Sequence, residues 1–141
     1  SPGTYTATPG QSACASCAAG RYQGERGATA CIMCDASSHC AEGATAAIMC
    51  EAGSYRSEPG ATSQGECDAC PAGSSCAAGS DAPTACEAGT IAASTGESVC
   101  AACDAGTYQS ASGATACVAC PAGKYAPQAL ENDCLLWYGE V

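Results

Sequence analysis

Residues 103–120, with the sequence CDAGTYQSASGATACVAC, contain the pattern that decides the fold. Cys103 and Cys117 enclose 13 residues, and Cys117 forms a C-x-x-C pair with the cysteine at position 120. With small changes, the same pattern recurs along the chain, starting at Cys17, Cys50, Cys86 and Cys120. Repetition at a nearly constant period indicates a tandem array of small units.

The residue types in this pattern suit a hairpin-like loop. Gly106 can supply a turn with positive φ, and Gly113 reverses the chain, so that each unit forms a ragged hairpin. Tyr108 has a flat, amphipathic side chain, which we expect to lie over the neighbouring disulfide. Thr115, just before the closing cysteine, suits a short strand or a side-chain hydrogen bond in a turn.

The composition explains why such a chain needs crosslinks. Cysteine accounts for 15 of the 141 residues, about 11%, which is above the level that marks a disulfide scaffold. Because the chain has no Phe, one Trp and two Met, apolar burial cannot offset its conformational entropy. We expect small disulfide-rich tandem repeats with short β-hairpins, otherwise irregular, with little or no helix. They should form an elongated rod in which each unit contacts only its neighbours.

Two units depart from the pattern. The segments CDASSHC at 34–40 and CPAGSSC at 70–76 carry His39 or Ser75 at the Tyr position and add Cys40 or Cys76. Ser37 replaces the turn glycine, which we expect to loosen that turn. The division is a truncated first repeat at 1–16, repeats at 17–33, 50–69, 86–102, 103–119 and 120–134, short cysteine-rich variants at 34–49 and 70–85, and an apolar C-terminal segment at 135–141.

Loop closure within each unit predicts the disulfide pairs. The expected pairs are Cys17–Cys31, Cys50–Cys67, Cys86–Cys100, Cys103–Cys117 and Cys120–Cys134, with Cys34–Cys40 and Cys70–Cys76 in the variants. A crossed arrangement, Cys34–Cys50 with Cys40–Cys67, stays open because sequence does not determine connectivity. Cys14 is left over, and we expect it to bridge to a cysteine before residue 1 in a longer array.

Zinc is the competing interpretation of the cysteines. The spacing of Cys14-x-x-Cys17 and Cys31-x-x-Cys34 is typical of a four-thiolate zinc site. Cysteines outside any C-x-x-C pair, such as Cys40, argue against it, as does the scarcity of Lys and Arg. We therefore expect no metal and no cofactor.

Other functional classes are disfavoured. The net charge of −10 argues against nucleic acid and anionic membranes as partners, and no apolar run is long enough for membrane insertion. His39 is the only histidine, so no Ser-His-Asp set can be assembled and we expect no enzyme.

The segments CPAGKY at 120–125 and CPAGSSC at 70–76, with their GAT-x-C-x-x-C closures, resemble ephrin-receptor-like cysteine-rich repeats. The single loops are also similar to the first module of tumour necrosis factor receptor repeats. The resemblance implies a β-poor, disulfide-laddered rod without catalytic residues. It also implies a setting at the cell surface or in a matrix, as in the surface and flagellar-hair proteins of protists and algae.

We therefore expect an extracellular structural repeat module of a filament, matrix or cell-surface coat, whose partners are other copies or other extracellular proteins. A receptor stalk or ligand-binding array is the alternative. Leu135, Leu136, Trp137 and Tyr138 form a candidate contact patch for a neighbouring subunit, or else a cap or the start of a further domain. The hydroxyl groups of Thr4, Thr6 and Thr8 are candidate sites for glycans.

Overall fold

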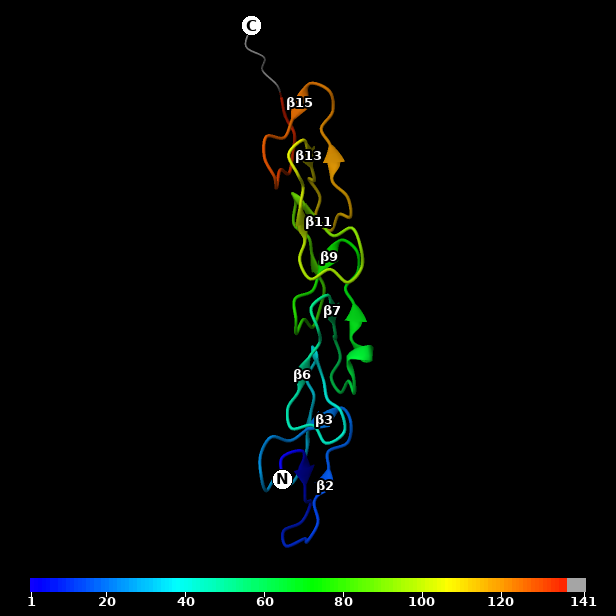
Figure 1. The fold of residues 1–141 in the computed structure, drawn as a ribbon, viewed down its shortest axis with the longest axis vertical. Helices are drawn as coiled ribbons and strands as arrows, with labels where there is room; N and C mark the ends of the chain where they lie inside the picture. Colours follow the sequence, from blue (N-terminus) through cyan, green and yellow to red (C-terminus); the bar gives the residue numbers. More distant parts are fainter. Residues whose placement is uncertain (137–141) are drawn as a thin grey trace. The chain divides into compact units, whose positions relative to one another are not determined.

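A computed structural model describes residues 1–136 and consists of short antiparallel hairpins with one 3-10 turn (Figure 1). Contacts divide it into two units, Ser1–Asp68 with Ala78–Ala82, and Ala69–Ala77 with Pro83–Val141. The elements up to position 69 are β1 (Thr4–Tyr5), β2 (Ala15–Ser16), β3 (Arg21–Tyr22), β4 (Ile32–Met33), β5 (Ser38–His39), β6 (Ile48–Met49), β7 (Ser54–Tyr55), η1 (Gln64–Glu66) and β8 (Asp68–Ala69). The later ones are β9 (Ser74–Ser75), β10 (Thr84–Ala85), β11 (Thr90–Ile91), β12 (Ala101–Ala102), β13 (Thr107–Tyr108), β14 (Val118–Ala119), β15 (Lys124–Tyr125) and β16 (Leu135–Leu136).

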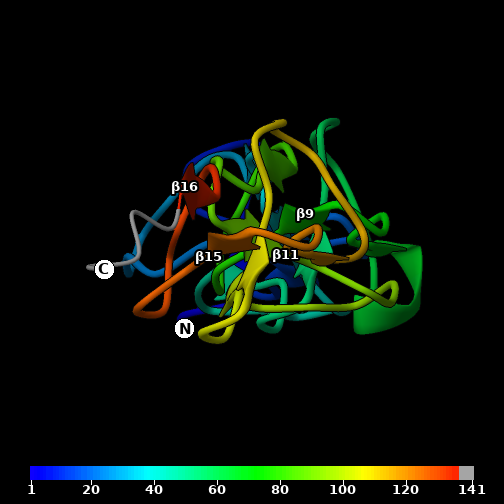
Figure 2. The same ribbon diagram turned by 90° about the horizontal axis from the view of Figure 1, so that it is seen from above.

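These strands form eight two-stranded sheets, one for each predicted repeat. The last of them joins β15 to β16, and both strands are labelled in Figure 2. The expectation of disulfide-rich repeats with short hairpins and almost no helix is confirmed. Two-residue strands are too short to stand alone in water, so each hairpin needs its crosslink and its neighbours. The sheets therefore hold the local geometry of each loop and do not form a continuous layer.

The second strand of each hairpin lies later than the sequence suggested. We expected the Thr or Ser before the closing cysteine in a short strand or in a turn with a side-chain hydrogen bond, and it lies outside the strands. The two residues inside C-x-x-C form the strand: Val118 pairs with Tyr108, and Ile32 pairs with Tyr22. The aromatic ring thus lies opposite the first of these two residues, where a cross-strand contact with a β-branched side chain is favourable.

Consecutive repeats inside a unit are joined by backbone hydrogen bonds. From repeat 17–33 to repeat 34–49, the N–H of Gly20 donates to the carbonyl of Cys40 at 2.7 Å, and the N–H of Gln23 donates to Ala44 at 3.0 Å. In the reverse direction, the N–H of Gly43 donates to the carbonyl of Cys17 at 2.8 Å. The same three bonds recur between equivalent positions of other repeats, so they are independent of most side chains.

Repeats that are two apart also touch, which corrects the expectation that each unit contacts only its neighbours. A Cβ built on Gly20 would lie 2.5 Å from the carbonyl oxygen of Gly60, far inside van der Waals contact. In the second unit, a Cβ on Gly73 would clash in the same way with the carbonyl of Gly113. The absent side chain at the first glycine of the pattern therefore lets the repeats pack closely.

Cysteine sulfur takes the place of a conventional core. The largest fully buried side chains are all cysteines, and they are Cys17, Cys34, Cys40, Cys50, Cys70, Cys76, Cys86 and Cys103. Among residues 1–136, the buried apolar side chains that are not cysteine are all alanines, namely Ala61, Ala92 and Ala126. Packing around small side chains buries little area, so the crosslinks must supply most of the stability.

Candidate functional site: disulfide framework and exposed strands

Seven disulfides link fourteen of the cysteines, and each closes a loop inside one repeat. The structure has Cys17–Cys31, Cys34–Cys40, Cys50–Cys67, Cys70–Cys76, Cys86–Cys100, Cys103–Cys117 and Cys120–Cys134. Their Cα–Cα separations of 5.7 to 6.2 Å lie in the range that a disulfide spans. The crossed arrangement, Cys34–Cys50 with Cys40–Cys67, is not the one that the structure adopts.

The two variant repeats move the crosslink without changing the hairpin. Ala47 and Pro83 stand where other repeats have the closing cysteine, and Cys40 or Cys76 supplies the partner sulfur instead. The position that these added cysteines occupy, six residues after the opening cysteine, is buried in several repeats. Cys40 is fully buried there, and Ala92 is 2% exposed. The added sulfur therefore fills a site that faces the interior in the regular repeats.

In three regular repeats, the residue at this same position has a long polar side chain that donates a hydrogen bond across the loop. The amide nitrogen of Gln109 donates to the carbonyl of Ala116 at 2.8 Å, and its amide oxygen accepts from the N–H of Ala111 at 2.9 Å. Gln23 donates the equivalent bond to the carbonyl of Ala30 at 2.7 Å, and its side chain is buried, with 6% exposed. This cross-loop bond ends one residue before the closing cysteine, so it holds the two arms of the loop beside the disulfide.

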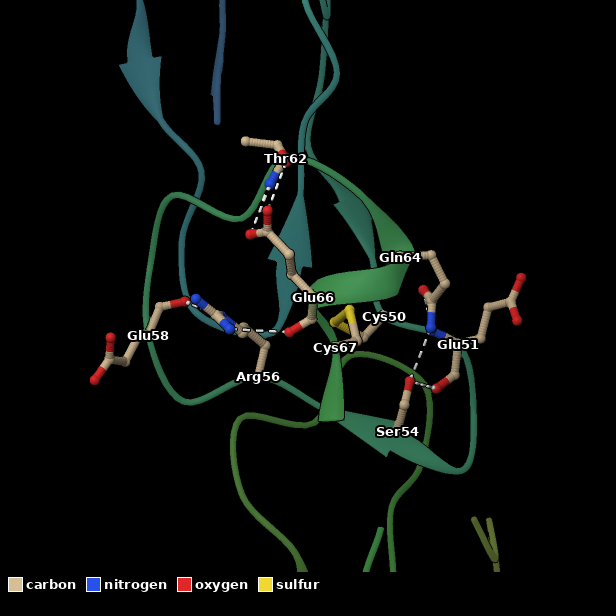
Figure 3. Close-up of a disulfide and its surroundings, with 9 residues drawn as sticks. All are labelled: Cys50, Glu51, Ser54, Arg56, Glu58, Thr62, Gln64, Glu66 and Cys67. Atoms are coloured by element: carbon tan, nitrogen blue, oxygen red, sulfur yellow. Dashed lines mark hydrogen bonds between the residues drawn. A yellow bond between two sulfur atoms is a disulfide. The ribbon is translucent and has the colours of Figure 1, made fainter. Parts of the chain in front are cut away.

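The repeat at 50–69 accommodates three extra residues around Cys50–Cys67 by a local network (Figure 3). Arg56 stands at the position of Gln109 and donates to the carbonyl of Glu66 at 2.9 Å, as well as to that of Glu58 at 3.2 Å. On the other side of the loop, Gln64 donates to the hydroxyl of Ser54 at 3.1 Å. The extra residues form η1 and leave the ends of the loop in place.

Two hydrogen bonds from Thr62 hold the carboxylate of Glu66. The hydroxyl of Thr62 donates to its carboxylate at 2.7 Å, and the N–H of Thr62 donates at 3.2 Å. The side-chain hydrogen bond and then the backbone bond lower the pKa of Glu66 below its usual value of 4.5, and Arg56 adds a small attraction. This carboxylate is exposed, and its two bonds from Thr62 cap the loop locally.

Large apolar side chains project into solvent from the second strands of the hairpins. Ile48 is 58% exposed and Met49 is 60% exposed, and β4 presents Ile32 and Met33 in the same way. Met49 also reaches the next repeat but one, where its sulfur would lie 2.7 Å from a Cβ on Gly79. We call β4, β6, β14 and β16 the exposed strands, because each carries a bulky aliphatic side chain that is at least 44% exposed.

Leu135 and Leu136 belong to this set. They form β16 opposite Tyr125 and Lys124, with exposed fractions of 46% and 54%. The first two residues of the candidate patch are therefore the closing strand of the last repeat, and this strand has counterparts at β4 and β6. Trp137 and Tyr138, the other two residues of that patch, lie outside the described residues. Sequence reasoning missed β4 and β6 because it assigned the strand to the wrong side of the closing cysteine.

The remaining candidates are dispersed. Cys14 is exposed and is the free cysteine among residues 1–136, and Cys17 and Cys34 are in separate disulfides, so the proposed zinc quartet is not assembled. In that described part, no three His, Cys, Asp or Glu side chains are grouped to hold a metal ion. His39 lies in β5 opposite Ile48. The turn at Ser37 is retained, with its N–H donating to the carbonyl of Arg56 at 2.7 Å, and the expected loosening stays a prediction.

A shallow pocket of about 320 Å³ opens beside β1 and β3, lined by Tyr5, Ala18, Arg21, Ala30 and Cys31. This is at the lower end of the volumes of ligand sites. It contains one cation and one phenol but no acid–base pair or nucleophile–base pair, so its lining indicates no catalytic chemistry.

Within the described residues, no helix is long and apolar enough to cross a membrane.

Residues 89–134 match the family described as tyrosine-protein kinase ephrin type A/B receptor-like. A comparison with curated proteins found no significant match. The matched segment is less than half of the chain. It contains the loops closed by Cys103–Cys117 and Cys120–Cys134 and the part of the Cys86–Cys100 loop that begins at Gly89. Seven disulfides fit an extracellular or secreted protein. The hairpins, the disulfides and the family match together support a cysteine-rich, ephrin-receptor-like module at residues 89–134.

Proposed function

We propose that this chain is an extracellular structural repeat module of a filament, matrix or cell-surface coat, which acts by assembly and not by catalysis. One observation carries the proposal: equivalent backbone atoms make the same hydrogen bonds from repeat to repeat. Gly89 N–H to Gln109 and Gly106 N–H to Ala126, at 2.7 and 2.9 Å, are such a pair in the second unit. A joint made of backbone atoms transmits structure along an array without a specialised site.

Mechanical considerations support the same function. Each disulfide closes its loop, so the residues inside that loop cannot be drawn out while the bond is intact. The loop in 103–119, for example, has its cysteines 14 positions apart. Such a chain resists extension and proteolysis through covalent bonds, which suits a protein with little apolar burial.

The exposed strands would supply the lateral contacts with other copies or with other extracellular proteins. Ile48 and Met49 lie side by side in β6, and their apolar surface is unusual on a chain of net charge −10. A filament of the flagellar-hair type is the finer prediction within this function. Glycans on the Thr4, Thr6 and Thr8 segment would stay compatible with it.

Electron microscopy of the purified chain tests the proposal. We expect ordered polymers or sheets, whereas discrete particles at every concentration would contradict an assembly role. The double variant Ile48→Ser with Met49→Ser should reduce lateral association. Val99→Ser is the matched control, because Val99 is 72% exposed but lies outside the exposed strands.

A ligand-binding ectodomain array is the second candidate, and the match of residues 89–134 to a family named after a receptor favours it. Immobilised chain would then retain a particular extracellular protein in stoichiometric amounts and would itself stay monomeric. Self-assembly without such a ligand would favour the structural function.

A further inference from the structure

We propose that the pocket beside β1 and β3, which we call the Arg21 pocket, binds an acidic sugar, a ring that carries a carboxylate or a sulfate. Arg21 would bind the acidic group and Tyr5 would lie against the ring. Such sugars are the units of acidic extracellular polysaccharides. The site does not depend on self-assembly, so the inference goes beyond the proposed structural function.

The lining of the Arg21 pocket combines one cation with apolar surface. The volume is about 320 Å³, and the walls are formed by Tyr5, Ala18, Arg21, Ala30 and Cys31, with no acidic side chain among them. The apolar face of a sugar ring can pack against the half-buried ring of Tyr5 and the two alanine methyl groups. A bare inorganic anion would leave this apolar wall uncovered. A volume at the lower end for ligand sites suits one ring.

The guanidinium of Arg21 is held over this lining. Its Nη1 donates to the carbonyl of Cys31 at 3.2 Å, and Cys31 is itself crosslinked to Cys17. The backbone of Arg21 pairs with Met33 across the hairpin. A guanidinium carries further N–H donors in the same plane, and these match the oxygens of a carboxylate or sulfate. The cation is therefore positioned before a ligand arrives.

Arg21 stands at a position where most repeats have a hydroxyl. Four of these hydroxyls donate to the carbonyl three residues earlier at 2.6 to 2.7 Å, namely those of Thr4, Ser54, Thr90 and Thr107. Arg21 forgoes this turn bond because its side chain bonds to Cys31, and only its backbone N–H bonds to Ala18, at 3.1 Å. The structure of the turn does not account for the cation, whereas a ligand would.

A pocket of about 290 Å³ lies at the equivalent place in the second unit, and we call it the Thr90 pocket. Its walls include Ser75, Glu87 and Thr90, which stand at the positions of Tyr5, Ala18 and Arg21. The repeats that build it, 70–85 and 86–102, have further repeats on both sides. The hollow is therefore a property of two consecutive repeats. The Thr90 pocket carries an acid and no cation, so it should reject an acidic sugar.

The charge around the Arg21 pocket differs from that of the rest of the chain. Residues 1–34 contain Arg21 and Arg26 against Glu25, a net charge of +1, whereas residues 35–141 contain two cations and 13 acids, a net charge of −11. Most of the chain repels an anionic ligand, but the two repeats that build this pocket do not. At physiological ionic strength, exposed charges more than about 8 Å away are largely screened.

Calorimetric titration at physiological ionic strength tests the site with three probes: a tetramer of galacturonic acid, a sulfated tetramer of galactose and the neutral tetramer of galactose. We expect both acidic tetramers to bind and the neutral one to bind about tenfold more weakly or less. Arg21→Thr should weaken the binding of the acidic tetramers about tenfold, because it removes a charged hydrogen bond. This variant restores the hydroxyl that other repeats have, so it should fold normally.

Arg26→Thr is the matched control, because it removes the same charge from the same repeat, and Arg26 is exposed and does not line the pocket. Its affinity should stay within about twofold of the unmodified chain. Equal losses in the two variants, or no loss in either, would overturn the proposal. So would equal binding of the neutral tetramer. Displacement by inorganic sulfate at the concentration at which the sulfated tetramer binds would reduce the site to one for a bare anion.

NMR of the unmodified chain gives a measurement that needs no variant. The ring resonances of Tyr5 should shift as an acidic tetramer is added, while the methyl resonance of Thr90 in the second unit should not. An unchanged Tyr5, or equal shifts at both, contradicts the assigned site. Ordered polymers without sugar binding would sink this inference and leave the structural function standing. Sugar binding by a chain that never assembles would do the reverse.

Discussion

At the scale of single residues, two positions among residues 1–136 have the positive φ that is typical of glycine although they are not glycine. Leu130 has φ +70° and stands at the second-glycine position, and Ser37 has φ +74° at the first-glycine position. Both positions keep the backbone hydrogen bond to the neighbouring repeat. The N–H of Leu130 donates to the carbonyl of Cys103 at 3.0 Å, and the N–H of Ser37 donates to that of Arg56 at 2.7 Å. A left-handed conformation costs an L-residue about 1–2 kcal/mol, so the surrounding contacts impose it. The array therefore tolerates a local mismatch where its neighbours hold the backbone.

The conformation of Leu130 leads to a prediction that reverses the usual order of Gly and Ala. We expect Leu130→Gly to be more stable to thermal unfolding than Leu130→Ala by about 0.5–1 kcal/mol, because only Ala retains the left-handed strain. Both variants lose the same 60% exposed side chain, so their difference isolates the backbone term. An Ala variant that equals or exceeds the Gly variant would show that Leu130 is unstrained.

A second residue-scale prediction concerns Glu66. Its pKa is lowered chiefly by the side-chain bond from Thr62, so the stabilisation is complete above the usual pKa of 4.5 and is lost as the pH falls through the lowered value. Thr62→Val should raise the pKa of Glu66 in an NMR titration, because it removes the bond from the hydroxyl but keeps the one from the N–H. Thr62→Ser should leave the lowered pKa unchanged. A Val variant with the original pKa would contradict the assigned cause.

At the scale of the element, the cross-loop side chain predicts a loss of stability in one loop. Gln23→Ala should lower the free energy of opening of its loop by about 1 kcal/mol, because it removes the bond to Ala30 and the one from Glu25. The more exposed Gln109→Ala should lose less. Hydrogen exchange in residues 24–31 checks the effect, and Gln11→Ala is the control because Gln11 makes its side-chain bond to Thr8 alone. Equal exchange in all three variants would argue against the cross-loop bond.

The hairpins also show how far sequence reasoning reaches. The recurrence of Cys, Gly and Tyr predicted eight loops with short strands, because cysteine spacing and turn glycines act within one repeat. It offered Thr115, which has high strand propensity, as a strand or turn residue, whereas Val118, directly after the closing cysteine, has the backbone pairing to Tyr108. Strand propensity cannot decide register when the strand has two residues.

At the scale of the whole molecule, the contacts between repeats were the part that sequence could not predict. Bonds such as Gln109 N–H to Glu131 join main-chain atoms, which leave no side-chain signature. Glycine is a partial exception, because Gly20 and Gly73 leave room for a carbonyl two repeats away. The sequence pattern alone, however, is equally consistent with a glycine that is needed only for a turn. The expected rod likewise stays a prediction, because cysteine spacing determines loops and not the angles between them.

These contacts predict how damage spreads when one crosslink is removed. Replacing Cys103 and Cys117 by Ala should remove about 3 kcal/mol of loop-closure stabilisation, in the chain-entropy model for a loop of roughly 15 residues. Because each repeat touches the next and the next but one, hydrogen exchange should accelerate through residues 70–134. The bonds of Gly20 and Gln23 in the first unit should keep their protection. A change confined to residues 103–119 would mean that the joints carry little energy, and acceleration through the first unit would mean that the array unfolds as a single cooperative body.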